Sequence, residues 1–368
     1  MSNWMFKLRG SLNRTQELVL GFIGLIIFIV LWWLAAEYFS IQKPIIEGYN
    51  SDISNTTIGL NVDSLARIDS IAYANATEFE KVHPLIPPPL KVFHSFAPLI
   101  NKDDLLPNLQ KSIWWNLQGY IWAILIAIPL GFIIGLYPVF RGLFSKQVDA
   151  MRYIPLTILT GIFITWFGIY DKMKVAFLAF GIIVYLLPVV VQRINEVKDV
   201  YLKTVFTIGA TDWQTIRSVY IPSVMSKLMD DIRVLTAISW TYIIIAELVN
   251  RQGGIGSLAY IKARQGQIEK VFAILIIIIA IGFLQDRIFA FLDKNLFPHK
   301  TCKSFVGGIK ESRFGLYGVL MALVIAALIT TAGMASSNVM LILGVIGVSA
   351  LLFAFYGQYM VRKANANG

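Results

Sequence analysis

The sequence predicts an all-α membrane protein, a polytopic bundle of helices that crosses the bilayer several times. Hydrophobic residues make up 57% of the 368 residues, and the mean hydropathy of +0.66 lies far above that of a soluble domain. The apolar residues gather in runs of about 20, the length that a helix needs to cross about 30 Å of hydrocarbon. Helices also satisfy their own backbone hydrogen bonds in lipid, which favours helical spans.

Eight apolar windows are predicted as spans. The window at residues 154–169 is short, but the aromatic residues near its ends, among them Trp166 and Tyr170, are typical of membrane interfaces. The first window is too long for a signal peptide and is expected to remain as an anchor. The windows are residues 18–38, 115–137, 154–169, 175–191, 234–249, 271–292, 314–334 and 339–359.

These spans predict four parts of the chain. An N-terminal tail with the first span is followed by a segment outside the cytoplasm. A transmembrane core with a polar cytoplasmic loop comes next, and two additional spans end the chain. The four parts are residues 1–38, 39–112, 113–298 with the loop at 199–227, and 299–368.

The positions of Lys and Arg predict that both termini lie in the cytoplasm. Basic residues precede the first span, follow the second and the sixth, and end the chain, as cytoplasmic loops do. The loop after the fifth span disagrees, because Arg264 and Lys270 then fall on the outer side. The net charge of +10 follows from this topology and from the pull of anionic lipid, so it does not indicate nucleic-acid binding.

The sequence has no motif for covalent chemistry. It contains no Walker A sequence, no Cys/His metal spacing and no Ser nucleophile elbow. The three histidines, His83, His94 and His299, are far apart, and Cys302 is the only cysteine. The chain is therefore expected to be no enzyme and to hold no catalytic, cofactor or metal site of its own.

The loop at residues 199–227 has the pattern of an element that docks on another protein. Apolar residues recur at helical spacings, Gly209 interrupts them, and Thr211 and Gln214 have the spacing of a capping box. Pro222 suits the first turn of the helix that enters the next span. The prediction is a helix, a kink, a short transverse helix and a return to the membrane. A helix lying flat on lipid is the alternative, which the acidic residues on the basic face disfavour.

The same loop resembles the cytoplasmic EAA coupling loop of bacterial ABC importer permeases. Gly209, Ile221 and Pro222 match that pattern, whereas Lys-Thr-Val at residues 203–205 replaces its Glu-Ala-Ala. Residues 209–214 are similar to the Gly-Ala-Ser-x-Trp-Gln of permeases for nitrate, sulfonate, taurine and related solutes. The resemblance extends over residues 87–298, through residues 87–89, 152–155, 165–168, 246–247, 253–256, 271–273 and 286–287.

This resemblance implies a type I ABC importer permease core of five to six spans in the bacterial inner membrane. Such a permease forms the path for a small polar or anionic solute and is driven by a separate ATPase subunit, which binds ATP and Mg. The implied partners are two ATPase copies, a second permease copy in a homodimer, an extracytoplasmic solute-binding protein and membrane lipid. The implied coupling residues are Gly209, Ala210, Thr211, Asp212, Trp213, Gln214, Ile221 and Pro222.

Polar side chains on two predicted spans are candidates for the translocation path. Glu247 stands apart because an ionisable group in a span is costly, and it is expected to form an outer gate or to pair with Arg251. For the hydroxyl residues, packing against neighbouring helices is the alternative. The candidates are Thr157 and Thr165 of the third span, with Gly161 between them, and Thr236, Ser239, Trp240 and Glu247 of the fifth.

Two other functions stay open at the level of sequence. An ATP-independent secondary transporter or channel usually places paired charges or broken helices near mid-membrane, whereas here the charges cluster at span ends. A scaffold that recruits a cytoplasmic partner would use residues 199–227 without any transport. The solute and the role of the last two spans do not follow from the sequence, although glycines such as Gly315 and Gly344 predict that these two helices pack closely.

Overall fold

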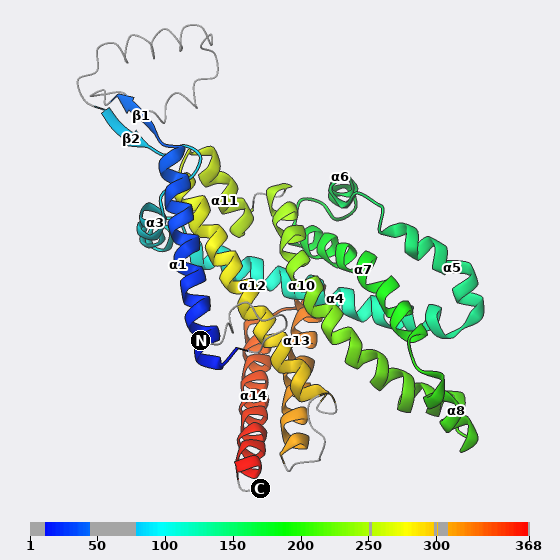
Figure 1. The fold of residues 1–368 in the computed structure, drawn as a ribbon. Helices are drawn as coiled ribbons and strands as arrows, with labels where there is room; N and C mark the ends of the chain where they lie inside the picture. Colours follow the sequence, from blue (N-terminus) through cyan, green and yellow to red (C-terminus); the bar gives the residue numbers. More distant parts are fainter. Residues whose placement is uncertain (1–11, 45–78, 250–251, 298–299, 301–307, 367–368) are drawn as a thin grey trace. The chain divides into compact units, whose positions relative to one another are not determined.

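The chain forms two compact units, each described by itself below (Figure 1). One unit comprises Met1–Leu105 with Leu258–Ile276, and the other comprises Leu106–Ser257 with Ile277–Gly368. The described part of the chain is almost entirely helical, as the sequence predicts, and it carries one small sheet. The computed structural model describes residues 12–44, 79–249, 252–297, 300 and 308–366.

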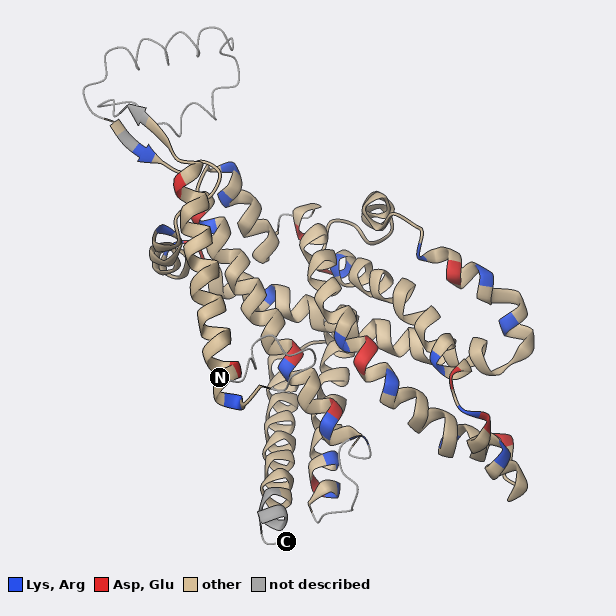
Figure 2. Ribbon diagram, in the orientation of Figure 1, with Lys and Arg blue, Asp and Glu red and all other residues tan. Residues whose placement is uncertain are grey.

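The first unit consists of a long helix, a short helix and a two-stranded antiparallel sheet, joined by the end of one core helix and the start of another. These elements are α1 (Arg14–Tyr38), β1 (Ile41–Pro44), β2 (Phe79–Val82), α3 (Pro89–Asn101), the end of α11 (Ile255–Arg264) and the start of α12 (Ile268–Leu296). The charged side chains of α1 lie only near its two ends (Figure 2). The Trp32 indole of α1 donates a hydrogen bond of 3.0 Å to the Pro87 carbonyl and stacks on Phe272. These contacts attach the apolar helix to the rest of its unit.

The second unit holds the helices that carry the candidate site. Its elements are α4 (Leu105–Leu136), α5 (Pro138–Met151), α6 (Leu156–Phe167), α7 (Asp171–Asn195), α8 (Asp199–Thr207), α9 (Asp212–Thr215), η2 (Ile216–Tyr220), α10 (Ile221–Val249), the rest of α12, α13 (Ile309–Ala332) and α14 (Ser337–Ala366). Most of α7 is buried, and it packs against α4 and α10. Gly119 and Gly131 of α4 permit this close approach, because a Cβ on either would lie 2.5 Å from a side chain of α7.

Seven helices in the described ranges are long and apolar enough to cross a membrane, and they correspond to seven of the eight predicted windows. The exception is residues 154–169, where α6 has only 12 residues. At 1.5 Å per residue it is about 18 Å long, short of the hydrocarbon core. Together α5 and α6 pass the same test, but they are bent by 106°. Residues 154–169 therefore form an eighth span only if the bent pair α5 and α6 crosses the membrane as one unit, so this span stays a prediction. Pro155 lies at the bend, where it disfavours helical backbone at the residue before it.

The last two helices form a closely packed pair, as predicted. Gly315 lies in the contact, whereas a Cβ on Gly344 would meet no atom within 4 Å. A Cβ on Gly315 of α13 would overlap the backbone of α14 at Ala354, and a Cβ on Gly357 of α14 would overlap the backbone of α13 at Ser312. Small residues thus let the two backbones approach, the usual arrangement between membrane helices. The left-handed Gly333, with φ 76°, ends α13 before the short connection to α14.

Candidate functional site

Gly209 ends α8 in a Schellman motif and turns the chain sharply. Its φ is +80°, a conformation that glycine adopts without strain. The Gly209 N–H donates to the Phe206 carbonyl at 3.0 Å, and the Ala210 N–H donates to the Val205 carbonyl at 3.1 Å. These two bonds satisfy carbonyl groups that the helix end would otherwise leave without partners. The predicted kink at Gly209 is confirmed.

A capping box begins the next helix, also as predicted. The Thr211 hydroxyl oxygen accepts a hydrogen bond from the Gln214 N–H at 3.3 Å, and the Gln214 side-chain oxygen accepts one from the Thr211 N–H at 2.8 Å. Asp212 lies in the first turn, where a negative charge interacts favourably with the helix dipole. The box fixes the direction in which the chain leaves the kink.

The helix that starts at Asp212 does not stop before the membrane, which corrects the predicted short transverse helix. It runs as one helix of 38 residues, Asp212–Val249. Pro222 lies within it and has no N–H to offer the Ser218 carbonyl. The backbone accommodates this loss in the π-helical turn η2, in which the Ile221 N–H bonds to the Ile216 carbonyl. The capped end is therefore continuous with α10.

Residues 199–227, which we call the coupling segment, expose large apolar side chains. The Trp213 side chain is 66% exposed and that of Ile208 is 78% exposed. Phe206 and Tyr201 are exposed as well. Large apolar groups gathered on one exposed segment mark a surface that another molecule covers.

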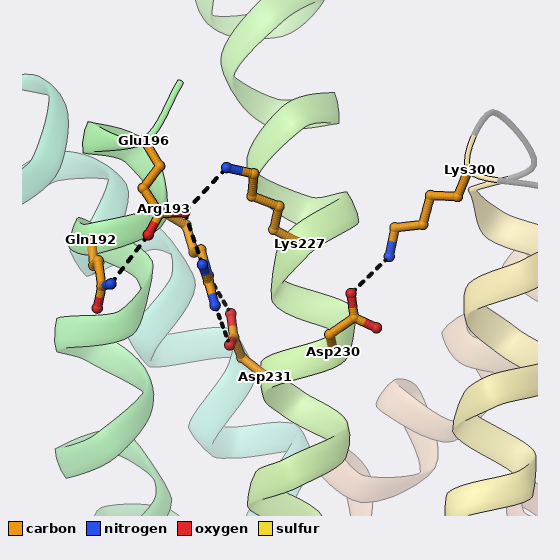
Figure 3. A network of polar contacts seen from close by, with 7 residues as sticks. All are labelled: Gln192, Arg193, Glu196, Lys227, Asp230, Asp231 and Lys300. Atoms are coloured by element: carbon orange, nitrogen blue, oxygen red, sulfur yellow. Dashed lines mark hydrogen bonds and ion pairs between the residues drawn. The ribbon is translucent and has the colours of Figure 1, made fainter. Parts of the chain in front are cut away.

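Charged side chains join the end of α7 to α10 beside the coupling segment (Figure 3). Arg193 donates to both carboxylate oxygens of Asp231, each at 2.7 Å. Glu196 accepts hydrogen bonds from Arg193 at 2.8 Å and from Lys227 at 3.1 Å. These bonds, first from Arg193 and then from Lys227, lower the pKa of Glu196 from 4.5 to about 2. We call these four residues the Arg193 network.

No local pattern in the sequence indicated the Arg193 network. Arg193 and Asp231 are 38 positions apart, and each resembles an ordinary charged residue near the end of an apolar window. A guanidinium that bonds to both oxygens of a carboxylate requires a defined geometry, so this contact constrains how α7 lies against α10.

The predicted path residues of α10 are buried against neighbouring helices. Asn116 of α4 donates to the Ser239 hydroxyl at 3.0 Å, and the Trp240 indole donates to Gln285 of α12 at 2.6 Å. The Thr236 hydroxyl donates to the Ile232 carbonyl at 3.0 Å. Their polar groups are thus used in contacts between or within helices of a single chain.

The predicted path residues of α6 face the other way. Thr157 and Thr165 are exposed, and a Cβ on Gly161 would meet no atom within 4 Å. The Thr165 hydroxyl donates to the Gly161 carbonyl of its own helix at 3.0 Å. One chain therefore does not bring the two groups of candidates into a common site.

Glu247 is fully buried and holds the glycine turn that follows α10. Its carboxylate accepts hydrogen bonds from the Ser112 hydroxyl at 2.5 Å and from the Gly256 N–H at 2.7 Å. The Ser112 oxygen accepts in turn from the Ile255 N–H at 2.8 Å. Gly254 has φ 104°, and a Cβ there would overlap the Glu247 carboxyl group. The proposed partner of Glu247, Arg251, lies outside the described residues.

Lys174 of α7 is a second buried charge at this turn, and no sequence pattern indicated it. Its side chain is 0% exposed, and its ammonium group lies 3.6 Å from the centre of the Trp115 ring. It also donates to the Gly253 carbonyl at 3.4 Å and lies 3.7 Å from Asp171. In the sequence, a lysine next to an apolar window is typical of a membrane interface, so nothing distinguished it.

Known proteins are similar to this chain over its helical core. The family model for binding-protein-dependent transport system inner membrane components covers residues 127–298, which include the coupling segment and α10. Residues 127–298 thus match the inner membrane component of a binding-protein-dependent transport system. Together with the seven helices of membrane-spanning length in the described residues, this match indicates a multi-pass membrane protein with a transport-permease domain. α1, α13 and α14 lie outside the matched region of the permease.

Curated relatives cover more of the permease. The putative aliphatic sulfonates transport permease protein SsuC of Bacillus subtilis (strain 168) is 26% identical over 215 residues, 58% of this chain and 77% of the relative. The taurine transport system permease protein TauC of Escherichia coli (strain K12) is 22% identical over 247 residues, 66% and 90% of the two chains. A structure of the MetNI methionine ABC transporter is 17% identical, with a TM-score of 0.47, over 54% of this chain and 96% of that chain.

Proposed function

We propose that this permease imports a small polar or anionic solute and is driven by a separate ATPase subunit that docks on the coupling segment. The observation that carries the proposal is the continuity of the helix Asp212–Val249. Its capped end includes the exposed Trp213, and its buried face includes Thr236 and Ser239. One rigid element thus connects a docking surface to the interior of the bundle.

The transmission of movement follows from this continuity. An ATPase subunit that binds Trp213 and moves on binding ATP displaces the start of α10. Gly209 allows a hinge before this helix, and the capping box keeps the helix end intact. The Arg193 network links the same part of α10 to α7, so both helices respond together. In this proposal ATP and Mg are bound by the ATPase subunit.

We propose that the permease works as a homodimer with two ATPase copies. One chain supplies one coupling segment, whereas an ATP-driven closure needs two ATPase subunits facing each other. The outward-facing polar residues of α6, Thr157 and Thr165, support this arrangement because a second copy would bring them to a shared path. The buried residues Thr236, Ser239, Trp240 and Glu247 then hold α10 in place and so position the walls of that path without lining it.

The solute class rests on the relatives. Two of them are named for aliphatic sulfonates and for taurine, which are small anionic or zwitterionic solutes. Such transporters receive their solute from a binding protein, in agreement with the description of the matched family. We place this partner outside the cytoplasm and both chain termini inside it, on the distribution of Lys and Arg. We place the permease in a bacterial inner membrane, as the description of the matched family suggests.

Uptake into liposomes tests the proposal against an ATP-independent transporter. The permease is reconstituted with the ATPase subunit that co-purifies from its native membrane and with its binding protein, and labelled taurine and an alkanesulfonate are the probes. We expect uptake of at least one probe only when ATP is present. Equal flux without ATP, or without the ATPase subunit, would contradict the proposal.

A further inference from the structure

A large apolar pocket separates α13 from the matched core in the second unit. It has a volume of about 1080 Å³ and is lined by α4, α10, α12 and α13. Its walls are mostly aliphatic and aromatic side chains. The volume is slightly above the roughly 300–1,000 Å³ usual for small-molecule sites. Residues from each helix include Ile124, Met225, Phe289, Leu320 and Val324.

The two ends of α13 are attached to the core by polar contacts, so the pocket lies under a helix that is held in place. At one end the Trp122 indole of α4 donates to the Thr331 hydroxyl at 3.3 Å. At the other end Asn295 of α12 accepts from Ser312 of α13 at 3.4 Å and from Gln358 of α14 at 2.9 Å. Between these attachments, the side chains of the described residues leave the pocket open.

The polar groups in the wall of the core do not fit a polar solute. Asn116 is hydrogen-bonded to Ser239, and Gln285 to Trp240. The Thr236 hydroxyl donates to a carbonyl of its own helix. Because these groups already have partners, the core presents an essentially apolar surface to the pocket.

Arg313 is the exception. It lines the pocket near the start of α13, and its Nε is buried without a hydrogen-bond partner. One Nη donates to the Tyr317 hydroxyl at 3.4 Å. Within the described ranges no carboxylate forms a salt bridge with it. A guanidinium in this situation matches a phosphate group, which accepts two parallel hydrogen bonds from its fork.

We propose that this pocket binds one anionic phospholipid, with an acyl chain between α13 and the core and the phosphate at Arg313. The lining of α13 runs from Ile309 to Val324, roughly 22 Å at 1.5 Å per residue. That length exceeds the depth of one leaflet, about half of the 30 Å core. Arg313 lies at the end of α13 that basic residues mark as cytoplasmic, where anionic lipids are abundant.

Other occupants fit less well. An apolar helix from a second copy would offer no anionic group to the Arg313 guanidinium, whose Nε is buried without a partner. A chain of methylene groups matches the apolar walls, and a lipid phosphate supplies the acceptor that Arg313 lacks. The lipid would thus join the additional helices to the core, a role independent of the proposed transport function.

Native mass spectrometry of the purified full-length chain tests this site. The protein in mild detergent is titrated with phosphatidylglycerol or phosphatidylcholine of equal chain length. We expect wild type to prefer phosphatidylglycerol, and Arg313→Gln to lose roughly tenfold in affinity for it, since one charge-assisted contact is removed. Lys310→Gln is the matched control, because Lys310 is exposed in the same turn and does not line the pocket.

A second variant fills the pocket without touching the charge. Val324→Trp is expected to lower the binding of both lipids while the protein remains folded by gel filtration. Equal binding of the two lipids by wild type would overturn the proposal, and so would equal effects of Arg313→Gln and Lys310→Gln. Lipid binding that Val324→Trp leaves unchanged, or a dimer that this variant dissociates with no lipid bound, would overturn it as well.

Discussion

Arg193 donates two hydrogen bonds to Asp231, each 2.7 Å long, and so joins the end of α7 to the continuous helix that begins in the coupling segment. The contact is half-buried, with side-chain exposures of 27% and 18%. Water therefore screens it less than an ordinary surface ion pair. In the proposed mechanism, this contact passes a movement of α10 to α7.

Asp231→Asn tests that link. Replacing one carboxylate oxygen by an amide group removes one of the two bonds and the opposite charge, so we expect a loss of about 1–3 kcal/mol of stability. The midpoint of thermal unfolding in detergent measures it. Asp230→Asn is the matched control, because Asp230 is 66% exposed and pairs with Lys300 at 3.2 Å. Equal effects of the two substitutions would show that the two-point contact has no special role.

The pH dependence of stability should report Glu196. Its pKa of about 2 in the folded protein lies below the ordinary value of 4.5, so folding favours the ionised carboxylate. Its contribution is complete above about pH 4.5 and is lost as the pH falls toward 2. We expect Glu196→Gln to lower the unfolding midpoint at pH 7, with a difference from wild type that shrinks as the pH falls below 4.5. A difference that stays constant down to pH 3 would contradict this expectation.

Thr211→Ala tests the capping box. The hydroxyl is an acceptor for the Gln214 N–H, and loss of such a cap costs about 1 kcal/mol. Faster hydrogen exchange at the amides of Asp212–Thr215 is the expected result. Thr207→Ala is the control, since the Thr207 hydroxyl bonds only to a carbonyl within α8 among the contacts described. Unchanged exchange in the Thr211 variant would mean that the box does not hold α9.

Gly254→Ala tests the turn around Glu247. An added Cβ would overlap the buried carboxyl group, and the backbone has φ 104°. Gly266→Ala provides the comparison, because Gly266 also has positive φ but its added Cβ would meet nothing within 4 Å. The strain of a left-handed residue alone costs roughly 1–2 kcal/mol, so Gly254→Ala should destabilise by clearly more. A smaller effect at Gly254 than at Gly266 would argue against tight packing on Glu247.

Local patterns in the sequence predicted local structure well. The kink at Gly209 and the box of Thr211 and Gln214 depend on residues within a few positions, so spacing alone identifies them. The apolar windows likewise predicted seven helices of membrane-spanning length. The π-helical turn before Pro222 was missed because a proline near a helix start and a proline inside a continuous helix have the same local sequence.

Contacts between distant residues could not be predicted. Arg193 and Asp231 pair across 38 positions, and Lys174 contacts Gly253 across 79. Each partner has an ordinary surface or interface role by itself. The burial of Ser239 and Glu247 depends in the same way on how α4 packs on α10, which no single window of sequence contains.

The docking role of Trp213 is tested most directly by the composition of the purified complex. The chain is isolated in mild detergent from its native membrane as wild type, as Trp213→Ala and as Trp33→Ala, and the nucleotide-binding subunit that remains bound is quantified. Trp33 is also exposed, at 51%, but lies in α1, outside the matched domain. We expect one ATPase subunit per permease chain in wild type and in Trp33→Ala, and a loss of roughly tenfold or more in Trp213→Ala, as for a buried aromatic hot spot. Retention of the full amount of ATPase by Trp213→Ala would contradict the assignment of the coupling segment.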